Sequence, residues 1–222
     1  MQEELEAALE RLLGEPVALT VAGRTDAGVH AWGQVAGFTA EVKQGLDLRR
    51  ALDAVTPDEI SVKAASVAGD GFDARRDARS RTYCYRVLAS QARSPFERGR
   101  ALWWPHPLDR ESLDRCAAAV VGTHDFTAFT PTQTEHVRFE RDVTRCEWRQ
   151  GTGIGPNPVL ELWIEADAFM RNMVRALVGT MLEVAAGRRP ADDFADLLRG
   201  APRERGGETA PAHGLYLASV RY

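Results

Sequence analysis

Hydrophobic residues recur every three or four positions in several segments, which is the spacing of a helix with one buried face. Segment 2–13 carries leucine and alanine at this spacing, and Gly14 and Pro16 follow it as stop signals. Segment 169–186 is apolar on more than one face, so we expect a helix that is buried on most sides. The predicted helices are 2–13, 46–55, 108–121, 169–186 and 192–198, and Asp109 is a suitable N-cap for the third.

Other segments alternate between apolar and polar residues, as a strand with one buried face does. The glycine-rich run 151–155 lies between two of them and is closed by Pro156 and Pro158. It lacks the Lys-Ser/Thr pair and the helix that follow a phosphate-binding loop, so a hairpin connection is the better interpretation. The predicted strands are 17–22, 35–38, 60–67, 137–149 and 159–166.

The composition is that of an ordinary globular protein, with 44% apolar and 27% charged residues in a chain of 222. This length suits one large domain or two small halves around a shared core. No run is long and apolar enough for a membrane span and no secretory signal is evident, so we expect a cytoplasmic protein. The three cysteines are far apart and in no paired spacing, which predicts reduced core thiols and argues against a zinc site.

The formal net charge of −4 does not suggest a nucleic-acid-binding protein, but it hides a local asymmetry. Segment 75–100 contains eight arginines and two acidic residues, which gives 8 − 2 = +6. A general preference for arginine over lysine explains the residue type but not the clustering. This segment therefore favours an anionic partner.

The loop 22–31 carries the candidate chemistry, because two glycines there flank Arg24 and Asp26 between two predicted strands. The residues alone allow three interpretations of Asp26. It is a turn aspartate bonded to its own loop backbone, a metal ligand together with His30, or a catalytic carboxylate held ionised by an arginine. The first is the commonest for an aspartate between glycines, and a pair of ligands without a third makes the second weak.

The loop resembles the signature of the TruA family of tRNA pseudouridine synthases, G-R-T-D-A-G-V-H-A followed by Q-V, which matches 23–31 and 34–35. So long a match at polar positions favours the catalytic interpretation of Asp26. The family's first strand and Tyr-Asp-Gly-type loop, which precede the first helix, are absent from this sequence. Four further blocks match in order: F-x-A-R with R-x-Y-x-Y at 72–85, G-x-H-D-F-x-x-F at 122–129, F-x-x-x-M-V-R-x-x-V-G at 169–179 and T-A-P-A-x-G-L-x-L-x-x-V at 209–220.

The resemblance implies an α+β fold with two similar halves, a largely antiparallel mixed sheet flanked by helices, and a catalytic cleft between the halves. The halves would be 1–90, which includes the loop 22–31, and 109–222, joined by the connection 91–108. The implied activity is the isomerisation of uridine to pseudouridine on the 3′ side of the anticodon stem-loop of tRNA, positions 38–40. It needs no cofactor and no metal, and the family works as a cytoplasmic homodimer in which one tRNA touches both subunits.

The resemblance also implies roles for individual residues. Asp26 would be the nucleophile, and Arg175 would reach it to keep it deprotonated and oriented. Tyr83 would stack on the flipped base and could handle the proton that leaves C5, while Leu215 would line a strand beside the pocket. Arg24 could hold a phosphate or fill the space that the flipped nucleotide leaves. The sequence leaves open whether Asp26 attacks C1′, adds to C6 or removes a proton from C2′.

Other interpretations stay open for some of these residues. Tyr83 and Tyr85 could form an ordinary half-buried sheet face, and Arg175, which would share a helix side with Arg171, could keep its head in water. The block 122–129 is interpreted as structural, packing through its two phenylalanines, because adjacent residues on an extended chain point to opposite faces.

Two rival functions are a non-catalytic tRNA-binding relative and a metal-dependent RNA enzyme using Asp26, His30 and His124. The first needs the arginines but not Asp26, and the second predicts loss of activity in chelator.

Overall fold

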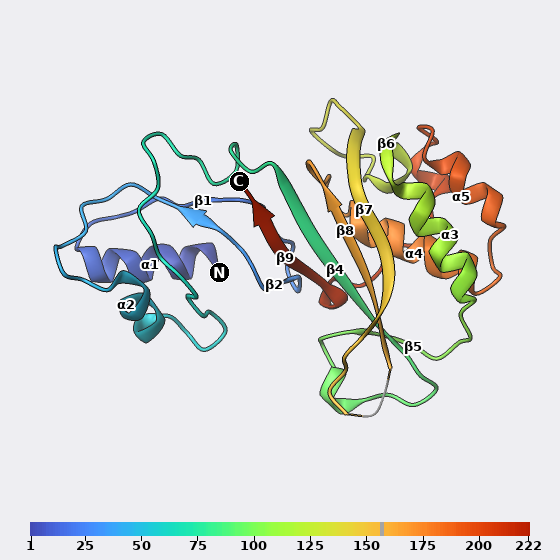
Figure 1. Ribbon diagram of the computed structural model, residues 1–222, viewed down its shortest axis with the longest axis horizontal. Coiled ribbons are helices and arrows are strands. Elements are labelled where there is room, and N and C mark those ends of the chain that lie inside the picture. The colour runs from blue at the N-terminus through green and yellow to red at the C-terminus, as the bar shows by residue number, and fades with distance from the viewer. Residues whose placement is uncertain (156–157) are drawn as a thin grey trace. The chain divides into compact units, whose positions relative to one another are not determined.

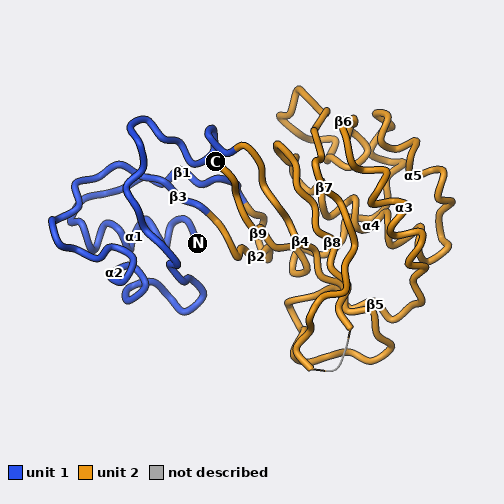
Figure 2. The backbone as a smooth tube through the Cα atoms, viewed as in Figure 1, with its two compact units in different colours: residues 1–24, 35–78 blue, residues 25–34, 79–222 orange. Residues whose placement is uncertain are grey.

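The computed structural model describes residues 1–155 and 158–222 (Figure 1). It combines helices with mostly antiparallel strands, so the predicted α+β class is confirmed. Two compact units divide the chain: unit 1 is Met1–Arg24 with Val35–Ala78, and unit 2 is Thr25–Gln34 with Arg79–Tyr222 (Figure 2). The predicted halves, 1–90 and 109–222, are defined by internal similarity rather than by compactness, and they stay a prediction.

Unit 1 is built from two helices and a small sheet. Its elements are α1 (Gln2–Leu13), β1 (Thr20–Val21), β3 (Ala36–Gly37) and α2 (Leu48–Val55), and β1 pairs with β3 in antiparallel fashion. Helix α1 has the predicted bounds because Gly14 ends it in the left-handed conformation, with φ of 82°. The buried Leu9 and Leu52 form the core of this unit together with neighbouring apolar side chains.

The predicted strand 60–67 is wrong. Neither sheet among the described residues includes this segment, and Val67 is fully exposed. Alternation of apolar and polar residues is a local property, whereas a strand also needs a neighbour to complete its ladder. Here the backbone N–H of Val62 donates instead to the Asp53 carboxylate at 2.9 Å.

Unit 2 is organised around β4 (Ser80–Ala89). The strand order of its sheet is β2-β9-β4-β8-β7-β6, and β5 pairs with β4 outside this path (Figure 1). The pairs β4–β8, β4–β9, β7–β8 and β6–β7 are antiparallel, while β2–β9 and β4–β5 are parallel. The other strands are β2 (His30–Ala31), β5 (Leu102–Trp104), β6 (Gly122–Asp125), β7 (Glu140–Gly151), β8 (Val159–Ala166) and β9 (Leu215–Arg221).

Several strand predictions for this unit are confirmed. Strand β8 has the predicted bounds, and β7 begins three residues after the predicted start at 137. Because β7 and β8 are antiparallel neighbours, the glycine-rich run connects a hairpin, as predicted. Pro156 of that connection lies outside the described residues.

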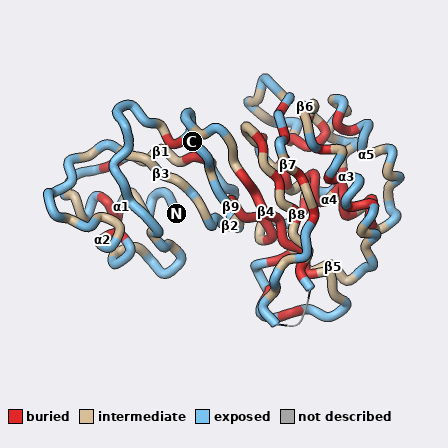
Figure 3. The backbone as a smooth tube through the Cα atoms, viewed as in Figure 1, coloured by how far each residue is buried: buried red, intermediate tan, exposed pale blue. Residues whose placement is uncertain are grey.

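Helices α3 (Arg110–Val120) and α4 (Met173–Ala185) pack on the sheet of unit 2, against β7 and β4 respectively, and α5 (Ala191–Leu197) contacts both of these helices. Buried residues gather along these elements (Figure 3). The predicted N-cap is confirmed, since Asp109 accepts a hydrogen bond from the Ser112 backbone N–H at 3.0 Å. The phenylalanines of block 122–129, Phe126 and Phe129, are fully buried, so that block packs as predicted.

Helix α4 begins later than predicted. Asn172 precedes it in the left-handed conformation, with φ of 61°, and this ends the helical path toward residue 169. Arg171 therefore lies outside the helix, and the predicted sharing of one helix side with Arg175 is wrong.

The predicted connection 91–108 contains structure of its own. A 3-10 turn, Pro95–Glu97, leads to β5, whose residues pair with the end of β4. Trp103 packs against a small buried cluster that includes Leu88, and Trp104 packs against the main core.

The three cysteines are free and buried, which confirms the prediction of reduced core thiols. Burial raises the pKa of the Cys116 thiol to about 11. Among the described residues, no helix has both the length and the apolar character that crossing a membrane requires.

Candidate active site

Asp26 lies on the loop that leads into β2, and its side chain is 43% exposed. The loop is folded by a turn in which the Val29 N–H donates to the Asp26 carbonyl at 3.0 Å. Gly28 then adopts φ of 83°, a conformation that favours glycine. Asp26 therefore starts a turn through its backbone carbonyl, but its carboxylate points to a partner far away in the sequence and not to its own loop, as the turn interpretation had it.

That partner is Arg175 on the first turn of α4. Its Nη1 lies 3.4 Å from Asp26 Oδ2, although the two residues are 149 positions apart. Two other bonds fix the guanidinium: Nε donates to the Ala210 carbonyl at 2.7 Å, and Nη1 donates to Asn172 Oδ1 at 2.9 Å. Arg175 is only 17% exposed, so the interpretation with its head in water is wrong.

Close packing of α4 makes this arrangement possible. A Cβ on Gly179 would lie 1.8 Å from the Glu208 carbonyl oxygen, so this position needs glycine. The segment that follows Glu208 can therefore run beside α4, where the Ala210 N–H donates to the Arg175 carbonyl at 3.1 Å. The backbone of this segment thus holds both the main chain and the side chain of Arg175.

Tyr83 is on β4 and is 9% exposed, with its ring packed edge-to-face against Phe169 at a centroid distance of 5.0 Å. Burial raises the pKa of the Tyr83 hydroxyl above its usual value; Arg81 opposes this rise and the negative charge of Asp26 adds to it. Tyr83 is therefore a protonated hydroxyl at neutral pH, within the electrostatic reach of Asp26.

The neighbouring Tyr85 is fully buried and donates its hydroxyl to the Pro211 carbonyl at 2.8 Å. Leu215 pairs with it at the start of β9 and is 7% exposed, within the main core. Arg24 is exposed and belongs to unit 1.

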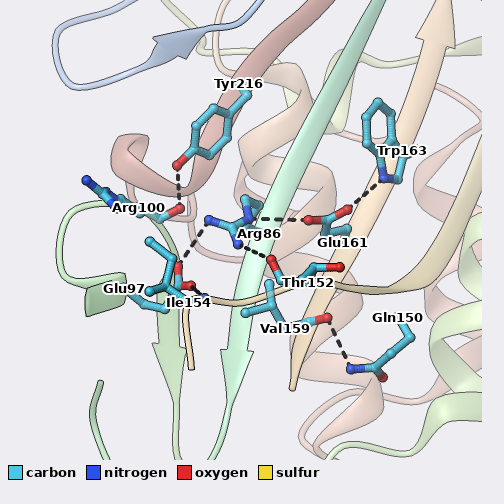
Figure 4. A network of polar contacts seen from close by, with 10 residues as sticks. All are labelled: Arg86, Glu97, Arg100, Gln150, Thr152, Ile154, Val159, Glu161, Trp163 and Tyr216. Carbon is cyan, nitrogen blue, oxygen red and sulfur yellow. Dashed lines mark hydrogen bonds and ion pairs between the residues drawn. The ribbon is translucent and has the colours of Figure 1, made fainter. Parts of the chain in front are cut away.

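The basic segment 75–100 contains one arginine that is not on the surface. Arg86 is buried, donates to Glu97 Oε2 at 3.0 Å and to Glu161 Oε1 at 3.3 Å, and also bonds the Thr152 carbonyl (Figure 4). Without the buried pair Arg86 and Glu97, the net charge of this segment is still +6, because seven arginines and Asp77 remain. The arginines of this segment that are exposed are Arg75, Arg76, Arg79, Arg93, Arg98 and Arg100.

The residues of the metal interpretation are not brought together. His30 is on β2 and His124 is on β6, and these strands form opposite ends of the strand order. His124 Nε2 bonds the Val121 carbonyl at 3.1 Å. In the part of the chain that the structure describes, no group of three or more His, Cys, Asp or Glu side chains is placed to hold a metal ion.

Comparison with known proteins identifies the family of this chain. Residues 116–222 match the family model of tRNA pseudouridine synthases. The chain is 42% identical over its whole length to a tRNA pseudouridine synthase A from Roseiflexus sp. (strain RS-1), of which it covers 82%. The chain belongs to the tRNA pseudouridine synthase family. Similar proteins with the same name are found in Myxococcus xanthus, at 40% identity and 83% coverage, and in Geobacillus sp. (strain WCH70), at 37% and 88%, each over the whole of this chain.

Some residues that shape the site of this tRNA pseudouridine synthase were not predicted from its sequence. Asn172 holds the guanidinium of Arg175, and Ala210 does so through its carbonyl. The signal for Asn172 is its side chain type, because asparagine tolerates the left-handed conformation better than other residues with a side chain. No side chain signal exists for Ala210, since its contribution comes from the backbone.

Proposed function

We propose that this synthase converts uridine to pseudouridine in the anticodon stem-loop of tRNA, at positions 38–40, with Asp26 as the nucleophile. The observation that carries the proposal is the ion pair of Asp26 with Arg175. A carboxylate that is 43% exposed faces an arginine whose Nε and Nη1 also bond the Ala210 carbonyl and the Asn172 side chain. Such a carboxylate is oriented and yet open to a substrate.

The reaction fits a site of this kind. The N1–C1′ bond of the nucleotide breaks, the uracil turns, and C5 joins C1′; C5 loses a proton and N1 gains one, so nothing is added or removed overall. No redox step occurs, and a single ionised carboxylate can act as the nucleophile. Arg175 holds that carboxylate in one orientation through the ion pair.

Three further residues have proposed roles in the reaction. Tyr83 meets the target base, and its protonated hydroxyl near Asp26 is suited to the proton that leaves C5. Leu215 supports the pocket from the first position of β9. Arg24 binds a phosphate of the RNA or fills the space of the flipped nucleotide.

Binding of tRNA is assigned to the exposed arginines of segment 75–100. Their phosphate contacts release counterions from the RNA, so affinity falls as salt rises. We expect replacement of Arg98 and Arg100 by glutamine to weaken tRNA binding and to reduce the slope of log Kd against log salt. An unchanged slope would mean that these arginines face solvent and do not contact the phosphates of the RNA. The resemblance adds a cytoplasmic homodimer in which one tRNA contacts both subunits.

A single-turnover assay tests the function. The enzyme in excess is mixed with tRNA in the presence of chelator, and pseudouridine is quantified over time for the parent and for Asp26→Asn. We expect product from the parent only, with equal tRNA binding by both. Asp58→Asn, which changes an exposed carboxylate of unit 1, is the matched control and keeps the parent rate.

Each rival predicts a different outcome. A non-catalytic tRNA-binding relative gives no product from the parent although tRNA binds, and a metal-dependent enzyme loses its activity in chelator. Substantial product from Asp26→Asn would refute the proposal that Asp26 is the nucleophile. The similarity of the whole chain to proteins named as synthases argues against the non-catalytic rival.

A further inference from the structure

Two hydrogen bonds tie a turn of segment 75–100 to the strands beside the Asp26 loop. His30 Nε2 lies 2.8 Å from the Gly99 carbonyl oxygen, and Tyr216 donates its hydroxyl to the next carbonyl, that of Arg100, at 2.7 Å (Figure 4 shows the second). Because a carbonyl only accepts, His30 Nε2 carries the hydrogen in this bond. His30 and Tyr216 are direct neighbours on β2 and β9, and their rings stack at 4.6 Å.

The turn itself is anchored to the centre of the sheet. Glu97 at its start is 2% exposed and pairs with Arg86 of β4 at 3.0 Å. Its other carboxylate oxygen accepts the Ile154 N–H at 2.7 Å (Figure 4), and its carbonyl accepts the Arg100 N–H at 2.9 Å. The Gly99 carbonyl is therefore presented by a segment that is fixed independently of the Asp26 loop.

The Asp26 loop, by contrast, depends on a short edge strand. Strand β2 has two residues, His30 and Ala31, and lies at the end of the strand order. Beyond it, the N–H groups of Trp32 and Gly33 donate to the Leu217 carbonyl at 2.8 and 3.1 Å. So short an edge strand is prone to local opening, and Asp26 is only four residues upstream of His30.

We propose that His30 is a positioning residue for the reaction. Its bond to the Gly99 carbonyl holds β2 against β9 and so keeps Asp26 at Arg175, within reach of the uridine. The inference rests on the proposed function. A displacement of about 1 Å at a reacting group can cost two orders of magnitude in rate, so loss of this bond slows chemistry and leaves tRNA affinity unchanged.

Three variants test the proposal in the single-turnover assay. His30→Leu removes the donor, and we expect the rate to fall roughly ten- to a hundredfold with an unchanged Kd for tRNA. His30→Gln places an amide nitrogen near the position of Nε2, and it should restore most of the rate. His124→Leu is the matched control, because His124 Nε2 also bonds a backbone carbonyl but does so on the opposite edge strand, and it should keep the parent rate.

The outcomes separate this proposal from the proposed function. If the parent forms pseudouridine and His30→Leu matches its rate, positioning by His30 is refuted and the function stands. A His30→Gln variant as slow as His30→Leu also refutes it, as does a loss of tRNA affinity at an unchanged rate. If the parent forms no product, the proposed function fails and the positioning role fails with it. Should His30→Leu not fold, His30→Asn, whose amide is too short to reach Gly99, replaces it.

Discussion

Removal of the Glu97 side chain tests whether the buried network around Arg86 stabilises unit 2. Glu97→Leu keeps the volume of the side chain but removes both of its acceptor oxygens. Arg86 then loses its partner at 3.0 Å, and the Ile154 N–H loses its acceptor at 2.7 Å (Figure 4). Arg86 keeps Glu161 at 3.3 Å and the Thr152 carbonyl at 3.0 Å.

The expected loss of stability is about 3–5 kcal/mol, which is typical when one partner of a buried ion pair is removed. The lower end applies because Glu161 still offsets the charge of Arg86, whose side chain is 9% exposed. Replacement of both partners, Arg86→Met with Glu97→Leu, should cost more than Glu97→Leu alone, since it also leaves the Glu161 carboxylate without its cation. In the double variant Glu161 keeps the neutral Trp163 indole N–H at 3.1 Å, whereas in Glu97→Leu it also keeps Arg86.

Urea unfolding followed by tryptophan fluorescence measures these losses. All five tryptophans lie in unit 2, so the signal reports that unit alone. Asp114→Ala, which breaks an exposed ion pair with Arg110, is the control and should cost less than about 1 kcal/mol. A loss below about 1 kcal/mol for Glu97→Leu, or a double variant more stable than this single one, would refute the reasoning.

Three further outcomes are expected. Arg175→Lys should lower the single-turnover rate roughly tenfold or more although the charge is kept, because one ammonium cannot bond the Ala210 carbonyl and Asp26 at the same time. A rate equal to that of the parent would argue against the role of the pair. Ser80 donates to Glu165 at 2.6 Å and is the main cause that lowers the pKa of this carboxyl, so Ser80→Ala should destabilise the protein at neutral pH. That difference should shrink as pH falls below the unfolded value of about 4.3, and a difference that grows in acid would contradict the linkage. The cysteine thiols, all buried, should resist a thiol reagent at pH 8 in the folded protein and react in urea, and reaction of the folded protein would place a thiol at the surface.

Elements that depend on local signals could be predicted from the sequence. Helix α1 ends where Gly14 can adopt a positive φ, and α3 begins where Asp109 can cap it. Segment 60–67 has an equally clear alternation but is not a strand, because pairing requires a neighbour that the segment itself does not specify. The start of α4 was missed for a related reason, since the left-handed Asn172 breaks a sequence that is otherwise typical of a helix.

The candidate site was predictable only through the family resemblance. Asp26 and Arg175 are 149 residues apart, and neither periodicity nor charge could pair them. The local charge count shows the same limit, because it treated Arg86 as part of a basic surface although that residue is buried with two carboxylates. Spatial pairing of charges is set by the tertiary fold and has no signature in a sequence window.

The ion pairs Arg86–Glu97 and Asp26–Arg175 differ in what surrounds the carboxylate, and this difference separates a structural arginine from the one that we propose to serve the reaction. The Glu97 side chain is 1% exposed and both of its oxygens accept from fixed donors, so its pair with Arg86 has no capacity for a ligand. The Asp26 side chain is 43% exposed and contacts Arg175 through one oxygen at 3.4 Å. Arg175 makes its shorter hydrogen bonds to the neutral oxygens of Ala210 and Asn172. The first pair satisfies all of its charges internally and fixes the turn at Gly99. The second leaves a carboxylate oxygen of Asp26 without a bond to Arg175, as the proposed nucleophile requires.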